Sequence, residues 1–159
     1  AGNEPLSARD AMEVFVGEMN NQTAAMGLTA THFVTPDGVH NSEHYTSMAD
    51  LLTLAQLCLS HPLISQVVST PQYTATLPNR QLYWKNSNMH LQGDSPYYLS
   101  NCIGLKTGYT HSAGRCLLSA FVIDGNWVIM GVFGCPDPGF TYITQFQASA
   151  YLYDTYLAA

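Results

Sequence analysis

The strongest constraint on the fold of this chain is a pair of apolar runs separated by a short polar turn. Cys116–Ile123 is followed by Asp124-Gly125-Asn126, and Trp127–Phe133 then resumes with β-branched and aromatic residues. Asp-Gly between two such runs is a strong hairpin signal, because a tight primed turn needs positive φ at its central residues. Each run has about seven residues, well short of the roughly 20 that a membrane-spanning helix requires. The sequence therefore predicts two antiparallel strands here.

A third strand is predicted immediately before this hairpin, at Ile103-Gly104-Leu105-Lys106-Thr107-Gly108-Tyr109, with the polar turn 110–115 in between. The three strands, at about 103–109, 116–123 and 127–134, then form an antiparallel meander. Because the strands are apolar on both faces, we expect helices to pack on each side of the sheet.

Helices are predicted on both sides of the meander in the sequence. The spacing of apolar residues favours helices over 10–26, from Ser47 to about residue 59, over 62–68 and over 141–157. The segment 70–100 is rich in Pro, Asn, Ser and Tyr, and we expect extended loops with short strands there. This order of elements is typical of an α+β fold.

Lys106 is the most informative candidate functional residue, because the chain has only five lysine and arginine residues. A lysine in an apolar strand presents its ammonium on a pleated surface, where it can meet an anionic group. Thr107 adds a hydroxyl, and Gly108 leaves room for another backbone to approach. Lys106-Thr107-Gly108 has the pattern of the third motif of penicillin-binding proteins and serine β-lactamases.

Further segments accompany this motif in a fixed order. They are Phe15–Asn20, Met26–Leu28, Thr31–Gly38, Ser47–Leu51, His61-Pro62, Val68–Thr70, Trp84–Asn88 and Gly104–Cys116. Together they span roughly residues 10–135, and in this order the chain resembles the D-alanyl-D-alanine carboxypeptidases, low-molecular-mass penicillin-binding proteins that trim peptidoglycan stem peptides. The resemblance implies a penicillin-binding protein/β-lactamase-like fold, with residues 1–159 as the C-terminal portion of its catalytic domain.

The resemblance also implies a mechanism of acyl transfer through a serine, which attacks the peptide bond between two D-alanines and forms an acyl-enzyme that water releases. In that scheme Lys106 acts on the substrate's terminal carboxylate and on the catalytic hydroxyls. The backbone N–H of Tyr109 forms half of the oxyanion hole. The expected substrate-binding residues are Thr107, Gly108, Thr110 and His111. The resemblance implies neither a metal nor an organic cofactor.

The chain departs from this family in its motifs. It contains no Ser-x-x-Lys, since the residues three before Lys85 and Lys106 are Leu82 and Ile103. We therefore expect the nucleophile in an N-terminal part of the same protein that is missing from this chain, and no activity from this chain alone. Ala1-Gly2-Asn3 is either an altered Ser-x-Asn motif or, as its short spacing to the following helix favours, an unrelated segment.

Two other functions remain alternatives. A non-catalytic penicillin- or muropeptide-binding module would keep the strand around Lys106 without a nucleophile. A β-lactamase of the same fold is less favoured, because the loops between the helices follow the carboxypeptidase pattern.

The resemblance implies a place and partners for the protein. The partners are stem peptides ending in D-Ala-D-Ala, with β-lactams as inhibitors, and the place is the extracytoplasmic side of a bacterial cell envelope. The formal net charge of −6 argues against nucleic acid as a partner, because phosphate backbones attract basic surfaces.

Several other residues carry weaker signals. His40-Asn41-Ser42-Glu43-His44 matches the pattern of inverted zinc peptidases, but Pro36 and Asn41-Ser42 disfavour the helix that such a site needs. We expect a surface loop with two solvated histidines instead. Arg115 is either a turn residue or a contact at the rim of the substrate site. Several aromatic residues either line a groove for glycan or peptide or belong to half-buried strands and loops: Tyr73, Tyr83, Trp84, Tyr97 and Tyr98.

The four cysteines show no Cys-x-x-Cys spacing. Cys58 and Cys116 lie on core-like faces and are expected to act as apolar fillers. Cys102 and Cys135 flank strands and are candidates for a disulfide in an oxidising compartment.

Overall fold

The computed structural model describes residues 6–157, so the Ala1-Gly2-Asn3 segment lies outside the described part of the chain. The described residues form two compact units that meet between Leu54 and Ala55 in the sequence. The elements in chain order are α1 (Ala8–Ala25), α2 (Met48–Ser60), α3 (Pro62–Ser69), β1 (Gln72–Leu77), β2 (Arg80–Lys85), the short 3₁₀ helix η1 (Met89–Leu91), β3 (Cys102–Thr110), β4 (Gly114–Ile123), β5 (Asn126–Cys135) and α4 (Thr144–Tyr156). The helices and antiparallel strands confirm the predicted α+β class.

The first unit consists of α1, a long loop and the start of α2. Ser7 caps α1, because its hydroxyl accepts a hydrogen bond from the Asp10 N–H at 3.2 Å. The loop is held to α1 by Asn20, whose side-chain amide makes two hydrogen bonds of 2.8 Å with the backbone of Phe33. At its other end Asp50 accepts hydrogen bonds from the Ala30 N–H and the Thr31 hydroxyl.

The apolar face predicted for the first helix is only partly buried. Met12 and Phe15 are more than half exposed, whereas Met19 and Met26 are partly covered. The helical spacing therefore predicted the helix correctly, but the described residues do not cover its N-terminal half.

The second unit is built on the three-stranded antiparallel sheet, in the order β3-β4-β5. The predicted meander is confirmed, with each strand two residues longer than expected. The turn between β4 and β5 consists of Asp124 (φ 50°) and Gly125 (φ 77°), flanked by the pair Ile123 and Asn126. Both turn residues have positive φ, as a two-residue primed turn requires.

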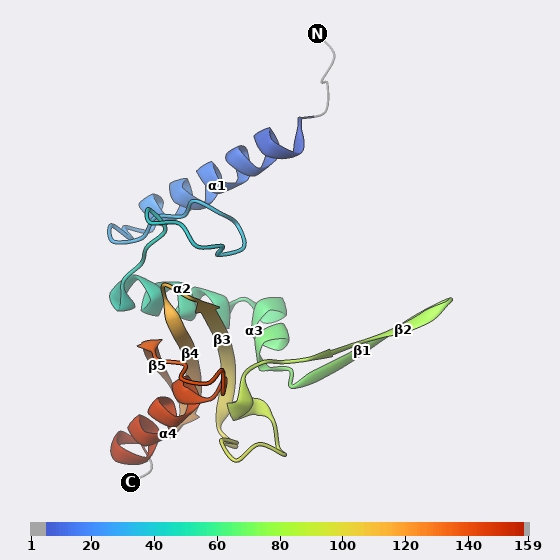
Figure 1. Ribbon diagram of the computed structural model, residues 1–159, viewed down its shortest axis with the longest axis vertical. Helices are drawn as coiled ribbons and strands as arrows, with labels where there is room; N and C mark the ends of the chain where they lie inside the picture. The colour runs from blue at the N-terminus through green and yellow to red at the C-terminus, as the bar shows by residue number, and fades with distance from the viewer. Residues whose placement is uncertain (1–5, 158–159) are drawn as a thin grey trace. The chain divides into compact units, whose positions relative to one another are not determined.

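Helices cover both faces of this sheet (Figure 1). On one face, Ala55 and Leu59 of α2 pack with Leu105 and Ala120, and Val68 of α3 adds to this cluster. On the other face, α4 contributes a second set of contacts: Phe146 packs on Leu117 and Val132, and Tyr153 packs on Phe121. The prediction of helices on each side of the sheet is confirmed.

The segment 70–100 contains more regular structure than the sequence indicates. β1 and β2 form a two-stranded hairpin that extends away from the three-stranded sheet (Figure 1). Its residues are almost all exposed. The predicted short strands are thus confirmed. Their pairing, for example of Tyr73 with Trp84, could not be recognised in a segment whose composition is typical of loops.

The last helix begins later than predicted, at Thr144 rather than 141. Phe140 and Tyr142 have φ values of 54° and 61°, which lie in the left-handed region and are incompatible with an α-helix.

The four cysteines are free. Cys102 lies opposite Phe121 and Cys135 lies opposite Arg115, at opposite ends of the sheet. The candidate pairing of these two cysteines was therefore wrong.

No helix within residues 6–157 is by itself long and apolar enough to cross a membrane; α2 and α3 reach that length and hydropathy only as a pair bent by 101°.

Candidate active site

The strand β3 carries Lys106-Thr107-Gly108 at an edge of the sheet. Among the described residues β3 pairs only with β4, so the backbone groups of its other edge have no strand partner. Such an edge is suited to bind an extended peptide as an added strand.

The Lys106 side chain is exposed, and among the described residues its ammonium donates a hydrogen bond only to the neighbouring Thr107 carbonyl. Within residues 6–157 no carboxylate lies within 4.0 Å of it, unlike the ammonium of Lys85, which pairs with Asp94 at 3.5 Å. Lys106 is therefore available to an anionic group from outside the described part of the chain.

Thr107 has a hydroxyl partner that the sequence did not single out as functional. The hydroxyl of Ser87 lies 2.6 Å from the Thr107 hydroxyl. Ser87 is held in place by its neighbour Asn86, whose side-chain amide donates to the carbonyls of Val68 and Thr70, both at 3.2 Å. The segment after β2 thus brings a second hydroxyl to the motif. The only signal in the sequence was the Asn86-Ser87-Asn88 segment within the family resemblance.

Gly108 is not required by the packing of the chain itself. A Cβ added there meets nothing closer than the Cβ of Cys116 at 3.9 Å, which is an ordinary contact. In contrast, a Cβ on Gly104 (φ +136°) would lie 3.1 Å from Val68. Gly104 is a packing glycine, whereas Gly108 leaves open space beside the free edge of the strand.

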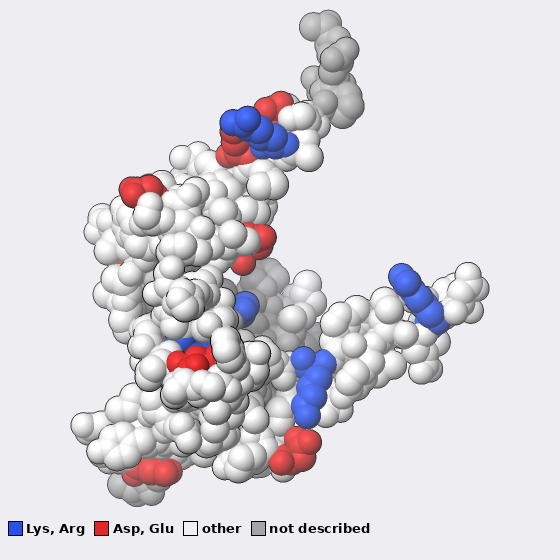
Figure 2. Space-filling view, in the orientation of Figure 1, with Lys and Arg blue, Asp and Glu red and all other residues white. Residues whose placement is uncertain are grey.

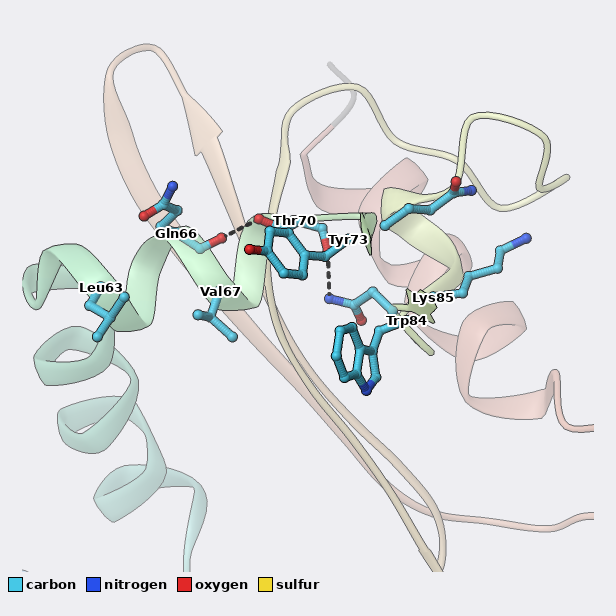
Figure 3. A pocket seen from close by; sticks show the side chains of 9 residues that line it. Leu63, Gln66, Val67, Thr70, Tyr73, Trp84 and Lys85 are labelled. Atoms are coloured by element: carbon cyan, nitrogen blue, oxygen red, sulfur yellow. Dashed lines mark hydrogen bonds between the residues drawn. The ribbon is translucent and has the colours of Figure 1, made fainter. Parts of the chain in front are cut away.

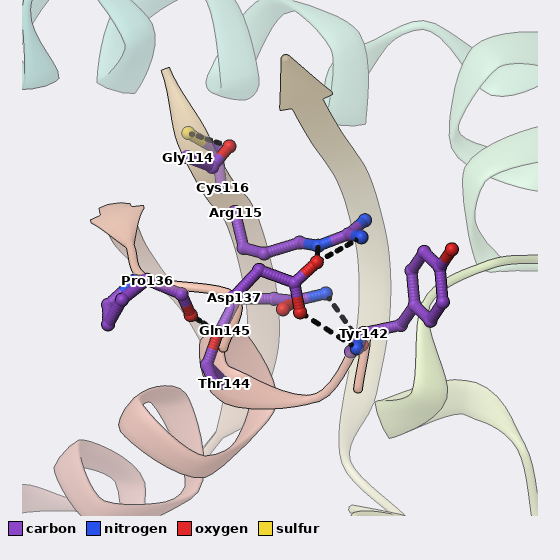
Figure 4. Close-up of polar contacts among 8 residues, drawn as sticks. All are labelled: Gly114, Arg115, Cys116, Pro136, Asp137, Tyr142, Thr144 and Gln145. Atoms are coloured by element: carbon purple, nitrogen blue, oxygen red, sulfur yellow. Dashed lines mark hydrogen bonds and ion pairs between the residues drawn. The ribbon is translucent and has the colours of Figure 1, made fainter. Parts of the chain in front are cut away.

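Tyr109 lies directly opposite Arg115 in the β3–β4 register. The Arg115 guanidinium stacks on two tyrosine rings. Its central carbon Cζ lies 3.7 Å from the ring centroid of Tyr109 and 4.1 Å from that of Tyr142. Asp137 accepts two hydrogen bonds from this guanidinium, at 3.0 Å from Nε and 2.6 Å from Nη2 (Figure 4). These bonds from Arg115 hold the pKa of Asp137 below its usual value. Arg115 therefore lies in β4 rather than in the turn, at the centre of a cluster with Tyr109, Tyr142 and Asp137.

The two remaining predicted site residues lie in and beside the turn after β3. The Thr110 hydroxyl accepts a hydrogen bond from the Ala113 N–H at 3.0 Å, so it supports the turn. His111 lines a hollow of about 350 Å³ together with Tyr109, Asp137 and Phe140. The structure thus gathers all six predicted residues, 106–111, along one strand and its turn, and it adds Ser87, Arg115 and Asp137.

The histidine segment 40–44 does not form the helix that a zinc site of its pattern needs. His44 packs edge-on against Phe33 and is partly buried, so only His40 of the two is exposed. The prediction of a surface loop is confirmed, but the prediction of two solvated histidines was wrong for His44. Within residues 6–157 no group of three His, Cys, Asp or Glu side chains is placed to hold a metal ion.

Two of the predicted aromatic residues line an open groove beside the hairpin. Tyr73 and Trp84 stack with their ring centroids 6.1 Å apart, and α3 contributes Leu63 and Val67 to the same groove of about 620 Å³ (Figure 3). Tyr97, in contrast, stacks on Phe146 in the core.

Charged side chains are few and scattered on the face shown in Figure 2, which agrees with the small number of charged residues in the sequence.

A profile of the D-alanyl-D-alanine carboxypeptidase family matches residues 9–137. The chain belongs to this family. A D-alanyl-D-alanine endopeptidase of Pseudomonas aeruginosa is 36% identical over 126 residues, which are 76% of this chain and 39% of the relative. A D-alanyl-D-alanine carboxypeptidase of Streptomyces is 34% identical over 121 residues, which are 72% of this chain and 40% of the relative. This carboxypeptidase-family chain therefore spans about two fifths of the length of these relatives.

Solved structures agree with this assignment. An alanine mutant of a Streptomyces DD-transpeptidase matches with a TM-score of 0.77 and 29% identity, covering 98% of this chain and 60% of the other. A penicillin-binding protein of Listeria monocytogenes in a cefotaxime-bound form matches with a TM-score of 0.71 and 27% identity, over 88% of this chain and 53% of the other. The carboxypeptidase-family chain therefore has the fold of part of a penicillin-binding protein, as the resemblance implied.

Proposed function

We propose that this chain supplies one wall of the active site of a serine-type D-Ala-D-Ala carboxypeptidase. The observation that carries the proposal is Lys106, an exposed cation on an edge strand with no carboxylate within 4.0 Å among residues 6–157. A substrate that ends in a carboxylate and lies along the strand would meet this charge. The proposed substrate is a peptidoglycan stem peptide ending in D-Ala-D-Ala.

In this proposal each residue of the motif has its own role. Lys106 attracts the terminal carboxylate and favours ionisation of a nearby catalytic hydroxyl. Thr107 donates a hydrogen bond to the same carboxylate, with its hydroxyl oriented by Ser87 at 2.6 Å. Gly108 leaves the strand edge open to the peptide backbone. The Tyr109 N–H stabilises the oxyanion of the tetrahedral intermediate.

The nucleophile is proposed to come from a part of the protein outside this chain. The chain contains no Ser-x-x-Lys. It spans 39% and 40% of two carboxypeptidase-family relatives, so those relatives are long enough to hold such a motif elsewhere. The serine attacks the carbonyl carbon of the penultimate D-alanine, the terminal D-alanine leaves, and water then releases the acyl group. A cell-envelope location outside the cytoplasmic membrane follows from this substrate and is part of the proposal.

Labelling with a fluorescent penicillin tests this function. The natural polypeptide that contains this chain is incubated with the label, digested and mapped by mass spectrometry. Label on a serine of a Ser-x-x-Lys sequence supports the acyl-enzyme mechanism. If penicillin binds reversibly and no residue is acylated, the alternative of a non-catalytic penicillin- or muropeptide-binding module replaces it.

A further inference from the structure

We propose that Arg115 is a positioning residue: held by Asp137, it fixes the ring of Tyr109 and thereby the direction of the Tyr109 backbone N–H. This inference rests on the proposed function, in which that N–H is half of the oxyanion hole. Oxyanion donors are effective only when they are aimed in advance at the position of the developing charge. A residue that fixes Tyr109 would therefore control the rate of acylation without touching the substrate.

The position of Tyr109 in the strand creates the need for such a support. Tyr109 is the last but one residue of β3, where the sheet ends and the turn begins. Side chains alternate along a strand, so the ring of Tyr109 lies on the face opposite to Lys106. Arg115 lies directly across from Tyr109 in β4 and stacks on this ring. The contact therefore holds the end of the strand from the face that does not carry the lysine.

The Arg115 guanidinium is itself fixed on all sides. Asp137 accepts two hydrogen bonds from its edge, and the rings of Tyr109 and Tyr142 lie within 4.1 Å of its centre. The second oxygen of Asp137 accepts a hydrogen bond from the Tyr142 N–H at 3.2 Å. Since the guanidinium is stacked on two rings and bonded to a carboxylate, it acts through Tyr109 rather than on a substrate.

This ion pair differs from the other two among residues 6–157. The side chains of Arg115 and Asp137 are 8% and 5% exposed, whereas those of Arg9–Glu13 and Lys85–Asp94 are between 47% and 87% exposed. Exposed pairs contribute little, because water and salt screen them, but a pair shielded from water holds a defined geometry. Among residues 6–157, the one shielded ion pair thus lies directly behind the proposed oxyanion donor.

The backbone beneath Arg115 is also constrained. Gly114 has a φ of +68°, and a Cβ added there would lie 2.8 Å from the Cys135 carbonyl oxygen. The start of β4 therefore contacts the end of β5 closely, next to the loop that carries Asp137. Three separate segments therefore contact one another here: the end of β3 with Tyr109, the start of β4 with Arg115, and the loop after β5 with Asp137.

The test uses the natural polypeptide and measures two quantities with a fluorescent penicillin: the final labelling stoichiometry and the second-order acylation rate constant. Arg115→Lys keeps the charge but removes the planar fork, and Tyr109→Ala removes the stacked ring. We expect each variant to reach the wild-type stoichiometry with a rate constant lowered by about 10-fold, part of the 10²–10³-fold loss of a whole oxyanion donor. Tyr109→Phe keeps the stacked ring, so its rate constant should fall less than that of Tyr109→Ala.

Two further variants separate positioning from general stability. Asp137→Asn should lower the rate constant as Arg115→Lys does, and the double variant should be no slower than either single one, because the residues act as a unit. Asp94→Asn disrupts the exposed pair with Lys85 and serves as the matched control, with no change expected. Wild-type rate constants in Arg115→Lys and Tyr109→Ala, or losses that match a fall in stoichiometry, would overturn the inference.

A second readout does not depend on catalysis. ¹⁵N relaxation of the Tyr109 amide should show a rigid N–H in the wild type and increased motion in Arg115→Lys. If the wild type takes no penicillin label but this difference is present, the proposed function fails while the positioning of Tyr109 by Arg115 stands. An equally rigid Tyr109 amide in both proteins contradicts the positioning role.

Discussion

The hydroxyl oxygens of Ser87 and Thr107 lie 2.6 Å apart, although 20 residues separate them in the sequence. This hydrogen bond joins the segment after β2 to the edge strand that carries Lys106. In the proposed mechanism the Thr107 hydroxyl donates to the substrate's carboxylate, which requires that the Ser87 hydroxyl be the donor in the Ser87–Thr107 pair. In that mechanism Ser87 would orient Thr107 for substrate binding.

Ser87→Ala is predicted to weaken substrate binding without preventing catalysis. The loss of one neutral hydrogen bond costs about 0.5–1.5 kcal/mol, which corresponds to a roughly 2–13-fold change in KM for a D-Ala-D-Ala peptide. The rate of D-alanine release from such a peptide measures the effect. Ser42→Ala, at an exposed loop position in the first unit, is the matched control. An unchanged KM in Ser87→Ala would show that Thr107 needs no partner.

His90 is predicted to make the fold sensitive to mild acid. Its ring is buried, with Nδ1 2.6 Å from the Tyr97 carbonyl and Nε2 2.9 Å from the Ser149 hydroxyl. Burial lowers the pKa of His90 below its ordinary value of 6.5. The unfolded chain therefore takes up a proton at a higher pH than the folded chain does, so stability is full above about pH 6.5 and falls as the pH drops toward the folded pKa.

Thermal unfolding at about pH 8 and about pH 5 checks this prediction. The melting temperature of the wild type should fall between the two conditions. His90→Gln lacks the titrating group, so its melting temperature should fall less over the same range. Equal losses in both proteins would assign the acid sensitivity to other groups.

Phe146→Ala is predicted to be strongly destabilising. Its ring is 2% exposed, packs on Leu117 and Val132, and contacts the rings of His90 and Tyr97. Removing a buried phenylalanine typically costs about 3–5 kcal/mol through lost burial and the cavity left behind. Denaturant unfolding measures the loss. Tyr151→Ala, on the same helix but with a side chain 70% exposed, should change the unfolding free energy by only about 0.5 kcal/mol.

Gly114→Ala is predicted to destabilise the protein more than Gly125→Ala. Both glycines have positive φ, 68° and 77°, which costs an alanine roughly 1–2 kcal/mol. At Gly125 the added Cβ meets nothing within 4 Å, whereas at Gly114 it would lie 2.8 Å from the Cys135 carbonyl oxygen. The difference between the losses of unfolding free energy in the two variants measures the cost of the steric clash at Gly114. Equal losses would mean that the end of β5 moves away freely.

The sequence predicted the meander well, because its signals are local. Asp124-Gly125 specifies a primed turn, and the flanking apolar runs specify the strands. The helices followed from apolar spacing in the same way, apart from α4. Its start was placed at 141, because nothing in the composition reveals the left-handed backbone of Phe140 and Tyr142. The hairpin β1–β2 was recognised only as short strands, since its residues are exposed and lack a clear alternation.

Contacts between residues far apart in the chain could not be predicted from the sequence. Arg115 pairs with Asp137 across 22 residues, and Ser87 reaches Thr107 across 20. Neither pair has a spacing that a periodic pattern would reveal. The candidate pairing of Cys102 with Cys135 failed for the same reason: both flank strands, but the register places them at opposite ends of the sheet. The candidate residues 106–111 lie together on β3 and in the turn after it because they are contiguous in the sequence.

The central claim is that Lys106 recognises the substrate's carboxylate, and Lys106→Gln in the natural polypeptide tests it most directly. Because Lys106 is exposed and has no ion pair among residues 6–157, the variant should keep the wild-type melting temperature. Its kcat/KM for release of D-alanine from a D-Ala-D-Ala peptide should fall about 10²–10³-fold. Lys85→Gln removes an exposed lysine from the same unit and should retain full activity. Equal kcat/KM values for Lys106→Gln and Lys85→Gln would contradict the account.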